Sequence, residues 1–470
     1  MGKLRGTGTF PIAARSALRD GKLRANLTNA TATIRQKRSA VVSEVPDWQQ
    51  LRDAASDIKD DVLANLDRYL IELERNVIDR GGTVHWARDA NEANEIILNL
   101  VLARDVSEVL KVKSMLTQEI GLNEALESAG VVPIETDLAE LIVQLGDDWP
   151  SHILVPAIHR NRTEIRDIFL REMAGVDIEL TDSPVELAEA ARRYLRTKFL
   201  TARVAISGVN FAVAETGTLC VVESEGNGRM CLTLPQTLIS VMGVEKVIPR
   251  WQDMEVFLQI LPRSSTGERM NPYTSMWAGA VEGQEFHLVI VDNGRTATLE
   301  DPDGRSTLRC IKCSACLNIC PVYERVGGHA YGSIYPGPIG AVLSPQLTGV
   351  LDNDSLPFAS TLCGACLDVC PVKIDIPSIL VHLRTRVIEE KRSKSHRPSG
   401  ERITMSLTAF VMSGWRRWRV AVWFVRLCRH IPGRSLLTRH IPGPLGRWGR
   451  FRDLPSILGD RKKTGGGVSK

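Results

Sequence analysis

The sequence predicts an α/β domain with a parallel sheet, followed by a smaller α-helical domain rich in cysteine and by a basic helical tail. Three observations predict this organisation. Apolar segments of strand length alternate with segments of helix length from Thr83 to about residue 300, which is typical of βαβ units. Seven of the ten cysteines fall between Cys310 and Cys370. The residues that follow Glu390 are strongly basic.

Residues 1–80 are predicted to form an N-terminal helical arm. In its second half, apolar side chains recur every three or four residues, which predicts one amphipathic helix that Asp47 caps and Gly81-Gly82 ends. These apolar positions are Leu51, Ala54, Ile58, Val62, Leu63, Leu66, Tyr69, Leu70 and Leu73. We expect the arm to pack on the rest of the chain and to carry no chemistry.

Residues 81–300 are predicted to form the α/β domain. The expected strands are Thr83–Ala87, Val106–Lys113, Val131–Glu135, Ile153–Val155 and Glu285–Val291. The expected helices are Asn91–Ala103, Glu119–Ala129, Leu138–Leu145, Thr163–Ala174 and Pro184–Leu200, the last of them capped by Ser183. Strands that alternate with helices at this spacing favour a parallel sheet with both faces covered.

A distinctive segment follows, in which two apolar runs flank Glu215-Thr216-Gly217-Thr218, and Glu225–Gly228 is expected to form a second tight turn. Glu215 and Thr216 could line a pocket at the strand ends, where ligands bind in open α/β sheets. Simple turn chemistry is the favoured interpretation. His152 and His159 are likewise expected to be structural rather than ligands. Neither a dinucleotide-binding fingerprint nor a P-loop is present.

The cysteines form two runs, each closed by proline. The first run is Cys310-x2-Cys313-x2-Cys316-x3-Cys320-Pro321, and the second is Cys363-x2-Cys366-x3-Cys370-Pro371. Three thiolates spaced by two residues can surround one face of an iron–sulfur cube, and in two-cluster ferredoxins the Cys before Pro ligates the other cluster. The spacing therefore predicts two [4Fe-4S] clusters with crossed ligands.

The crossed pattern gives the clusters unequal ligand sets. Cluster 1 receives Cys310, Cys313, Cys316 and Cys370, and cluster 2 receives Cys320, Cys363 and Cys366. Alignment of the second run with the first places Ser360 at the position of the missing cysteine. Cluster 2 is therefore expected to use a Ser oxygen or water as its fourth ligand, or to be a [3Fe-4S] cluster.

A structural zinc site and disulfides are the alternative interpretations of these runs. Zinc is usually bound by Cys-x2-Cys pairs around a longer insert, and disulfides need an oxidising compartment. The polar segment Met1–Arg38 contains no signal-peptide core, and no apolar run has the length of a membrane span. We therefore expect a cytoplasmic protein. Cys220, Cys231 and Cys428 are expected to be small buried apolar residues.

Residues 301–392 are predicted to form the dicluster domain, and 393–470 a basic C-terminal region. The Gly/Pro-rich loop Gly327–Gly340 is expected to bring backbone amides to the cluster sulfurs. From Lys391 onward, nineteen Lys and Arg against three acids give +16; the total of +4 then leaves −12 for residues 1–390. Such an asymmetry indicates docking on an acidic partner or on anionic lipid.

The tail is expected to contain a basic amphipathic helix, and Arg-His-Ile-Pro-Gly occurs in it twice, at Arg429–Gly433 and Arg439–Gly443. Its apolar stripe is Leu407, Val411, Trp415, Trp418, Val422 and Val425. A helix of this kind can lie on the inner face of the cell membrane as a peripheral contact or pack against a protein, which is the favoured interpretation. Nucleic acid is not an expected partner, because the rest of the chain is acidic and carries no binding motif.

Several segments resemble the lactate utilisation protein B family, and the resemblance covers nearly the whole chain. They are Leu308-Arg-Cys-Ile-Lys-Cys-Ser-Ala-Cys-Leu-Asn-Ile-Cys-Pro-Val-Tyr323, Gly328-His-Ala-Tyr-Gly332, Tyr335-Pro-Gly-Pro-Ile-Gly-Ala-Val342, Leu362-Cys-Gly-Ala-Cys-Leu-Asp-Val-Cys-Pro-Val-Lys373, Asn210-Phe-Ala-Val-Ala-Glu-Thr-Gly-Thr218 and Glu225-Gly-Asn-Gly-Arg229. The resemblance implies a lactate-utilisation domain that is similar in fold to sugar-phosphate isomerases and formyltetrahydrofolate cyclo-ligase. It also implies a helical ferredoxin-like domain similar to that of succinate dehydrogenase iron–sulfur subunits. The family shares the seven-cysteine pattern.

The resemblance implies the iron–sulfur subunit of a three-protein complex that oxidises L-lactate to pyruvate. The partners would be a cysteine-rich subunit and a second subunit with a lactate-utilisation domain. In the favoured hypothesis the chain only relays electrons, because no flavin or nicotinamide motif is present. In the alternatives, the α/β domain is itself catalytic toward a 2-hydroxy acid, or the chain is an iron–sulfur redox sensor.

Overall fold

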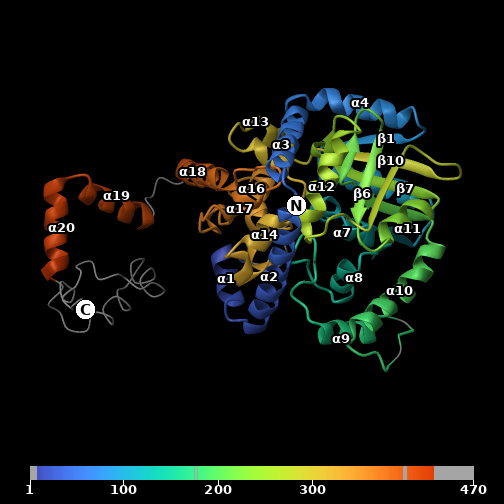
Figure 1. Ribbon diagram of the computed structural model, residues 1–470, viewed down its shortest axis with the longest axis horizontal. Helices are drawn as coiled ribbons and strands as arrows, with labels where there is room; N and C mark the ends of the chain where they lie inside the picture. Colours follow the sequence, from blue (N-terminus) through green and yellow to red (C-terminus); the bar gives the residue numbers. More distant parts are fainter. Residues whose placement is uncertain (1–7, 174, 177, 395–399, 428–470) are drawn as a thin grey trace, which may run out of the picture. The chain divides into compact units, whose positions relative to one another are not determined.

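The computed structural model describes residues 8–173, 175–176, 178–394 and 400–427. The chain divides into two compact units, the first ending at Glu390 and the second beginning at Lys391 (Figure 1). The predicted arm, the α/β domain and nearly all of the cysteine-rich domain share the first unit. The boundaries placed at residues 81 and 301 remain predictions, because the contacts inside this unit are continuous.

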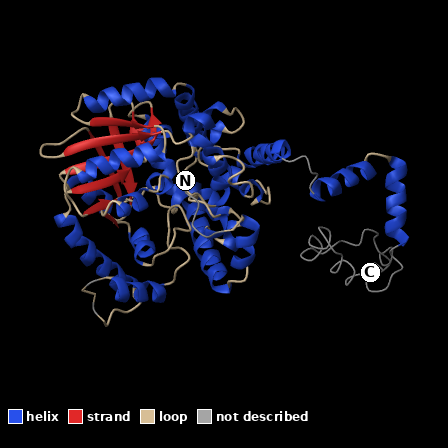
Figure 2. Ribbon diagram, turned by 180° about the vertical axis from the view of Figure 1, so that it is seen from behind, coloured by secondary structure: helices blue, strands red, loops and turns tan. Residues whose placement is uncertain are grey.

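A six-stranded parallel sheet forms the centre of the α/β domain (Figure 1 and Figure 2). Its strand order is β1-β10-β7-β4-β2-β3. The strands are β1 (Thr83–Ala87), β2 (Glu108–Lys111), β3 (Val132–Glu135), β4 (Val204–Gly208), β7 (Thr237–Gly243) and β10 (Glu285–Val291). Strands β10 and β7 pair over their full lengths, from Glu285 with Thr237 to Val291 with Gly243. Their nearly continuous apolar sequences reflect burial on both faces.

Successive residues of each strand point to opposite faces of the sheet. Val109 and Ile206 belong to the core beneath α5 (Ala90–Leu102), α6 (Met115–Glu119) and α7 (Leu122–Ser128). Their neighbours Leu110 and Ala205 belong to the core on the other face. That face is covered by α4 (Leu66–Ile78), α8 (Leu138–Leu145), α9 (Arg162–Glu172) and α10 (Pro184–Thr201). The predicted parallel sheet with two covered faces is confirmed.

A second sheet of four strands was not predicted. Its order is β8 (Val247–Ile248), β5 (Phe211–Val213), β6 (Thr218–Glu223) and β9 (Tyr273–Ala278). The short elements around it are α11 (Asn227–Thr233), the 3-10 helix η1 (Val244–Lys246), α12 (Asp253–Ser265) and α13 (Arg295–Glu300). Phe211 stacks on Phe257 of α12, with ring centroids 4.9 Å apart, inside a core that also contains the cysteine-rich domain. The small sheet thus connects the two domains.

The N-terminal arm consists of α1 (Phe10–Ala17), α2 (Gly21–Ser43), α3 (Trp48–Ala64) and α4. The single helix expected over the second half is wrong, because the chain breaks at Asn65 (φ −130°, ψ 35°). Helices α2 and α3 pack on the cysteine-rich domain, with α2 alongside α14 (Ala315–Ile319) in Figure 1, whereas α4 packs on the parallel sheet. Asp47 and Ser183 occupy N-cap positions, but neither side chain accepts a capping hydrogen bond.

The cysteine-rich domain is helical, as predicted. After α13 it contains η2 (Arg305–Arg309), α14, α15 (Tyr323–Val326), η3 (His329–Tyr331), α16 (Gly337–Thr348), η4 (Leu356–Phe358), α17 (Ala365–Val369) and α18 (Ile376–Lys394). Helices α14 and α17 lie in contact with each other. Helix α14 contains Cys316 and helix α17 contains Cys366, so the packing of these two short helices brings the two runs together.

Three further predictions of local structure are wrong. The helix expected over Glu119–Ala129 is interrupted at Gly121, whose φ of 69° is incompatible with a continuous right-handed helix. Ile153–Val155 is not a strand, because the N–H groups of the last two residues donate to Nδ1 of His152, at 3.1 and 3.0 Å. Glu225–Gly228 is not an isolated turn, since α11 begins inside it at Asn227.

The tail contains α19 (Gly400–Met412) and α20 (Trp415–Leu427), so the stripe predicted on one helix is divided between two. Leu407 and Trp415 are exposed in them. Cys428 and both Arg-His-Ile-Pro-Gly segments lie outside the described residues. Of the helices that the structure describes, none combines the length and the apolar character needed to cross a membrane.

Candidate functional site

The two cysteine runs fold into loops with the same backbone course. Lys312 directly precedes Cys313, and Leu362 directly precedes Cys363, which occupies the equivalent position in the alignment. The two residues have positive φ values of 61° and 55°. Ser314 and Gly364, two residues further on, have φ values of 63° and 84° and precede α14 and α17. Left-handed backbone is uncommon for residues other than glycine. Its use at matching positions indicates that both loops must bend around a similar object.

Ser360 occupies the same position in the second loop as Cys310 occupies in the first loop. The N–H of Lys312 donates to Sγ of Cys310 at 3.4 Å, and the N–H of Leu362 donates to Oγ of Ser360 at 3.1 Å. The two hydrogen bonds join the same relative positions. The structure therefore supports the alignment that places Ser360 at the position of the missing cysteine.

The first loop carries buried sulfurs that lie near Cys370 of the second run. Burial raises the pKa of Cys313, and repulsion from Cys370 and Cys310 adds to this effect. Burial also raises the pKa of Cys370 to about 11, although N–H groups oppose this change, including that of Ile374, which donates to its Sγ at 3.3 Å. A metal centre between these sulfurs would offset both the burial and the repulsion, so the donor set fits an iron–sulfur cluster.

The second loop lies near Cys320 of the first run. Burial raises the pKa of Cys366 to about 12, and repulsion from Cys320 and Cys363 contributes to the rise. Cys320 Sγ accepts the N–H of Tyr323 at 3.5 Å. Cys363 is exposed, as is Leu362 beside it, whereas the corresponding Cys313 is buried. The cysteine before each proline thus lies with the other run, and the second set of sulfurs is closer to solvent.

None of the nine cysteines that the structure describes forms a disulfide. Cys220 and Cys231 are buried as predicted. The expectation that the loop Gly327–Gly340 brings backbone amides to sulfur is not met for the cysteine sulfurs in the part of the chain that is described. The N–H groups that donate to them belong to Lys312, Tyr323 and Ile374. The loop is instead a packing element, since a Cβ on Gly328 would lie 1.9 Å from the carbonyl oxygen of Ser151.

Two arginines of the arm hold the backbone of the second run. Arg52 Nε donates to the carbonyl of Cys370 at 2.9 Å, and Arg38 Nη2 donates to the carbonyl of Val369 at 3.0 Å. Burial lowers the pKa of both arginines, and the charge of Cys370 opposes this shift. The arm therefore supplies positive charge to the sulfurs assigned to cluster 1. The arm packs on the rest of the chain, as expected, and it also places two cations beside the second run.

Lys59 is a third buried cation of the arm. Its Nζ donates to the carbonyls of Glu245 and Val247, and burial lowers its pKa to about 8. Arg52 and Lys59 are both buried on α3, seven residues apart. Positions that are seven residues apart lie on one face of a helix. Charged residues inside the apolar stripe of α3 were the signal by which sequence reasoning could have found them.

A cavity of about 360 Å³ lies at the carboxyl ends of the parallel strands. Residues that follow β2, β4 and β7 line it, including Lys113, Asn210 and Lys246. Its other wall is formed by Ile311 and Lys312, which come directly after Cys310. Ligands in open α/β sheets bind at this edge. The cavity therefore joins the expected ligand position of the α/β domain to the first cysteine loop.

A buried ion cluster lies against this cavity. Arg295, which is 2% exposed, donates to both carboxylate oxygens of Glu119 at 2.8 and 3.0 Å and to Glu245 at 2.6 Å. Tyr335 of the cysteine-rich domain donates its hydroxyl to Glu119. Burial alone would raise the pKa of Glu245, but attraction to Arg295 outweighs it and holds this pKa at about 2. This ion cluster fixes the strand ends of the α/β domain against the cysteine-rich domain.

Glu215 and Thr216 do not line this cavity at the strand ends. Glu215 instead borders a separate pocket of about 480 Å³, together with Asp61 and Arg250. Glu215 and Thr216 both lie in the hairpin between β5 and β6. The Glu215 carboxylate accepts the N–H of Trp251 at 2.9 Å, and Thr216 Oγ1 donates to Oγ1 of Thr218 at 2.8 Å. The nearby Asn210, which sequence reasoning missed as a pocket residue, is the one that reaches the cavity wall.

The two histidines are structural, as expected. His152 Nε2 lies 3.1 Å from Oδ1 of Asn318 in the cysteine-rich domain. His159 uses both ring nitrogens, bonding Ser151 Oγ at 2.7 Å and Asp148 at 2.8 Å.

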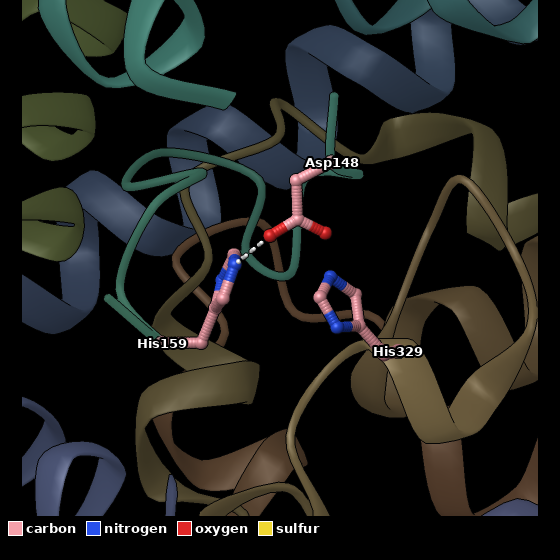
Figure 3. Close-up of side chains that lie close together, drawn as sticks. All are labelled: Asp148, His159 and His329. Atoms are coloured by element: carbon pink, nitrogen blue, oxygen red, sulfur yellow. Dashed lines mark hydrogen bonds and ion pairs between the residues drawn. The ribbon is translucent and has the colours of Figure 1, made fainter. Parts of the chain in front are cut away.

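Figure 3 shows the Asp148 carboxylate facing the rings of His159 and His329. Their ligand atoms lie within 4.8 Å of one another, a spacing that could hold a metal ion. However, Arg160 Nε also donates to this carboxylate at 3.0 Å, and His329 Nε2 lies 2.7 Å from the carbonyl of Trp149. Because the guanidinium already balances the carboxylate, the group is best described as an interdomain hydrogen-bond network.

Comparison with known proteins identifies two regions of the chain. Residues 70–293 match the LUD domain, and residues 306–374 match the 4Fe-4S dicluster domain. The chain is 44% identical to "Lactate utilization protein B" of Oceanobacillus iheyensis, covering 92% of this chain and 91% of the relative. It is 40% identical to the protein of the same name from Bacillus subtilis, covering 96% and 94%. It is 42% identical, with the same coverage, to "Uncharacterized electron transport protein YkgF" of Escherichia coli.

Proposed function

The chain belongs to the lactate utilization protein B family, and from this premise we propose that it transfers electrons through two iron–sulfur clusters during the use of lactate. The chain has the α/β lactate-utilisation domain and the 4Fe-4S dicluster domain that its sequence predicts. The observation that carries the proposal is the pair of matching cysteine loops, whose sulfurs divide into two sets inside that domain. Iron–sulfur clusters supply one-electron transfer.

We assign the ligands according to the crossed pattern. Cluster 1 takes Cys310, Cys313, Cys316 and Cys370, and cluster 2 takes Cys320, Cys363 and Cys366. The mutual repulsion of the thiolate forms within each set supports this division, because it shows that these sulfurs lie close together. For cluster 2 we propose Ser360 Oγ or water as the fourth ligand, or a three-iron cluster.

The two sets of sulfurs have different surroundings, which suggests a direction for the electrons. The cluster 1 loop borders the cavity of the α/β domain and lies near cations of the arm. The cluster 2 loop exposes Cys363 and Leu362 to solvent. We propose that electrons enter on the cavity side and leave from the exposed side to a partner protein. Electron transfer requires close approach, and an exposed loop with an apolar side chain permits it.

We further propose that the electrons come from the oxidation of L-lactate to pyruvate in a complex with a cysteine-rich subunit and a second lactate-utilisation subunit. Thiolate ligands favour a reducing, cytoplasmic location. The basic tail would dock on a partner subunit; peripheral contact with the inner face of the membrane is the outcome to test against it.

A second candidate function is catalysis in the α/β domain itself, which the cavity at the strand ends favours. Glu225 lines this cavity, and burial raises its pKa to about 7, close to the value suited to a general base. The electron-relay function remains the better supported, because no segment of the chain matches a motif for a hydride-accepting cofactor.

The experiment that separates these functions uses the full chain, purified and reconstituted without oxygen. We expect dithionite to reduce its clusters, and L-lactate to reduce them only after the partner subunits are added. Reduction by lactate in the isolated chain, or turnover with an artificial electron acceptor, would assign the chemistry to the α/β domain. Failure of lactate to reduce the clusters in the complete complex would refute the relay.

A further inference from the structure

We propose that the cavity between the parallel sheet and the first cysteine loop binds a small organic carboxylate, with Lys246 and Lys312 as the cations that hold its carboxylate group. The inference rests on the proposed function only in the choice of ligand, which we take to be a 2-hydroxy or 2-oxo acid. The binding site itself is inferred from the shape and charges of the cavity.

The cavity has room for such a ligand beside its polar wall. Its volume is about 360 Å³, which accommodates a compact acid together with ordered water. Glycines keep the polar groups of the wall in place at the strand ends. A Cβ on Gly243 would lie 2.1 Å from Oε2 of Glu245, and one on Gly208 would lie 2.7 Å from Oγ of Ser114. The strand ends are therefore shaped around polar side chains, as at a ligand site.

The guanidinium of Arg295, although it lines the cavity, is already engaged by carboxylates of the protein. It is bonded to the carboxylates of Glu119 and Glu245. Lys113 is also engaged, since its Nζ donates to the carbonyl of Leu154 at 2.8 Å and lies 3.9 Å from Glu140. These two cations of the cavity are thus committed to the protein.

Lys246 and Lys312, the other two cations that line the cavity, are not engaged in this way. The Nζ atoms of Lys246 and Lys312 form no hydrogen bond or ion pair at contact distance with any residue that the structure describes. Lys312 Nζ lies 4.2 Å from the centre of the Tyr335 ring. Burial lowers the pKa of Lys246, and repulsion from Lys312 adds to this effect. Glu245 attracts both lysines, but Glu119 and Glu245 together supply two negative charges against the three positive charges of Arg295, Lys246 and Lys312. Two ammonium groups held near each other in a partly dry cavity therefore favour a further anion. An organic carboxylate supplies this anion.

Carboxylates that also line the cavity limit the ligand to a small monoanion. Burial raises the pKa of Glu225, and repulsion from Asp137 and Glu223 adds to this rise. A long polyanion such as a nucleotide would meet these carboxylates and be repelled. Asn271 lines the same cavity, and its buried Oδ1 has no hydrogen-bond partner among the described residues. This oxygen can accept a hydrogen bond from a ligand hydroxyl.

Lys246 and Lys312 could instead serve only to balance the negative charge of cluster 1, since the charge of Cys310 acts on Lys246. The two roles make different predictions. A charge-balancing lysine affects the cluster but confers no affinity for an organic acid. A ligand-binding lysine confers that affinity, and its loss weakens binding.

The test is isothermal titration calorimetry of the full reconstituted chain with L-lactate, pyruvate and inorganic phosphate, without oxygen. We expect at least one organic acid to bind more tightly than phosphate. Lys246→Gln should weaken this binding by about 10- to 100-fold, the usual effect of losing a hydrogen bond to a charged group. Lys22→Gln is the matched control, because Lys22 is an exposed lysine paired with Glu164 and is not among the residues that line the cavity. Iron content verifies that the variants retain their clusters.

Three results would overturn the inference: no binding of either organic acid, phosphate bound more tightly than both, or unchanged affinity in Lys246→Gln. A Lys246→Gln chain with an altered cluster signal but no change in ligand affinity would assign the lysine to charge balance alone. The proposed function is judged separately. If the chain binds an organic acid but lactate does not reduce the clusters of the complex, the relay is refuted and the binding site stands. If lactate reduces the clusters but no organic acid binds to this chain, the binding site is refuted and the relay stands.

Discussion

Replacement of Ser360 by cysteine should supply cluster 2 with a fourth thiolate. The structure indicates that the new sulfur needs little rearrangement. Leu362 donates to Ser360 Oγ at 3.1 Å, whereas Lys312 donates to Cys310 Sγ at 3.4 Å, and the φ values of the two donors differ by only a few degrees. The longer contact to sulfur is therefore already accommodated in the first loop by the same backbone.

The magnitude follows from the ligand count. If cluster 2 holds three irons, the natural chain should contain about seven irons and Ser360→Cys about eight. If cluster 2 holds four, both chains contain about eight, and the fourth iron of the natural chain is lost first on exposure to air, because an oxygen ligand binds iron less tightly than a thiolate. In either case the three-iron signal should decrease in the variant.

The assay is iron and sulfide analysis of the chain reconstituted without oxygen, combined with electron paramagnetic resonance during timed exposure to air. Thr361→Cys is the matched control, since it adds an exposed thiol one residue out of register. Ser360→Ala separates the two oxygen ligands: greater loss of iron indicates Ser360, and no change indicates water. The reasoning is refuted if Ser360→Cys leaves iron content and air stability unchanged, or if Thr361→Cys has the same effect. Stoichiometric zinc without iron would also refute it.

Two further predictions concern the contacts that hold the two domains together. Arg295→Met leaves two buried carboxylates without their cation and should lower the free energy of unfolding by about 3–5 kcal/mol, measured by urea titration. The control is Arg88→Met, which removes an exposed ion pair and should change this free energy little. Equal effects of the two substitutions would contradict the role of burial. Gly328→Ala places a Cβ 1.9 Å from the carbonyl oxygen of Ser151 and should lower the free energy of unfolding by about 1–3 kcal/mol in the same titration. Gly21→Ala is the control, because no atom lies within 4 Å of the new Cβ there. An unchanged urea midpoint for Gly328→Ala would show that the two segments are not held in this contact.

The arm shows how a segment outside the two matched domains contributes to the site. Arg38 and Arg52 lie before residue 70, where the LUD match begins, yet they bond the backbone that carries Cys370. Positive charge near a cluster raises its reduction potential, because the reduced cluster is more negative. The arm therefore packs on the dicluster domain, and its arginines would raise the reduction potential of a cluster bound by Cys370.

The sequence by itself determined the elements whose signals are local. The spacing of the cysteines, the prolines that close each run and the position of Ser360 follow from residues at most a few positions apart, and the matching loops agree with them. Strands β1 and β10 and helix α8 have the predicted bounds. Buried parallel strands and amphipathic helices have short periods that any window of the chain displays.

Other features depended on which segments meet in space. The sequence did not indicate that Lys113, Lys246 and Lys312 would line one cavity. Nor did it indicate that Glu119, Arg295 and Tyr335 would form one ion cluster, because these residues come from elements far apart in the chain. Residues 153–155 resemble a strand locally, but the side chain of His152 takes the N–H groups that a strand would need. Local pattern specifies which surfaces are apolar, whereas the pairing of those surfaces, and thus the position of every charge between them, is decided by tertiary packing.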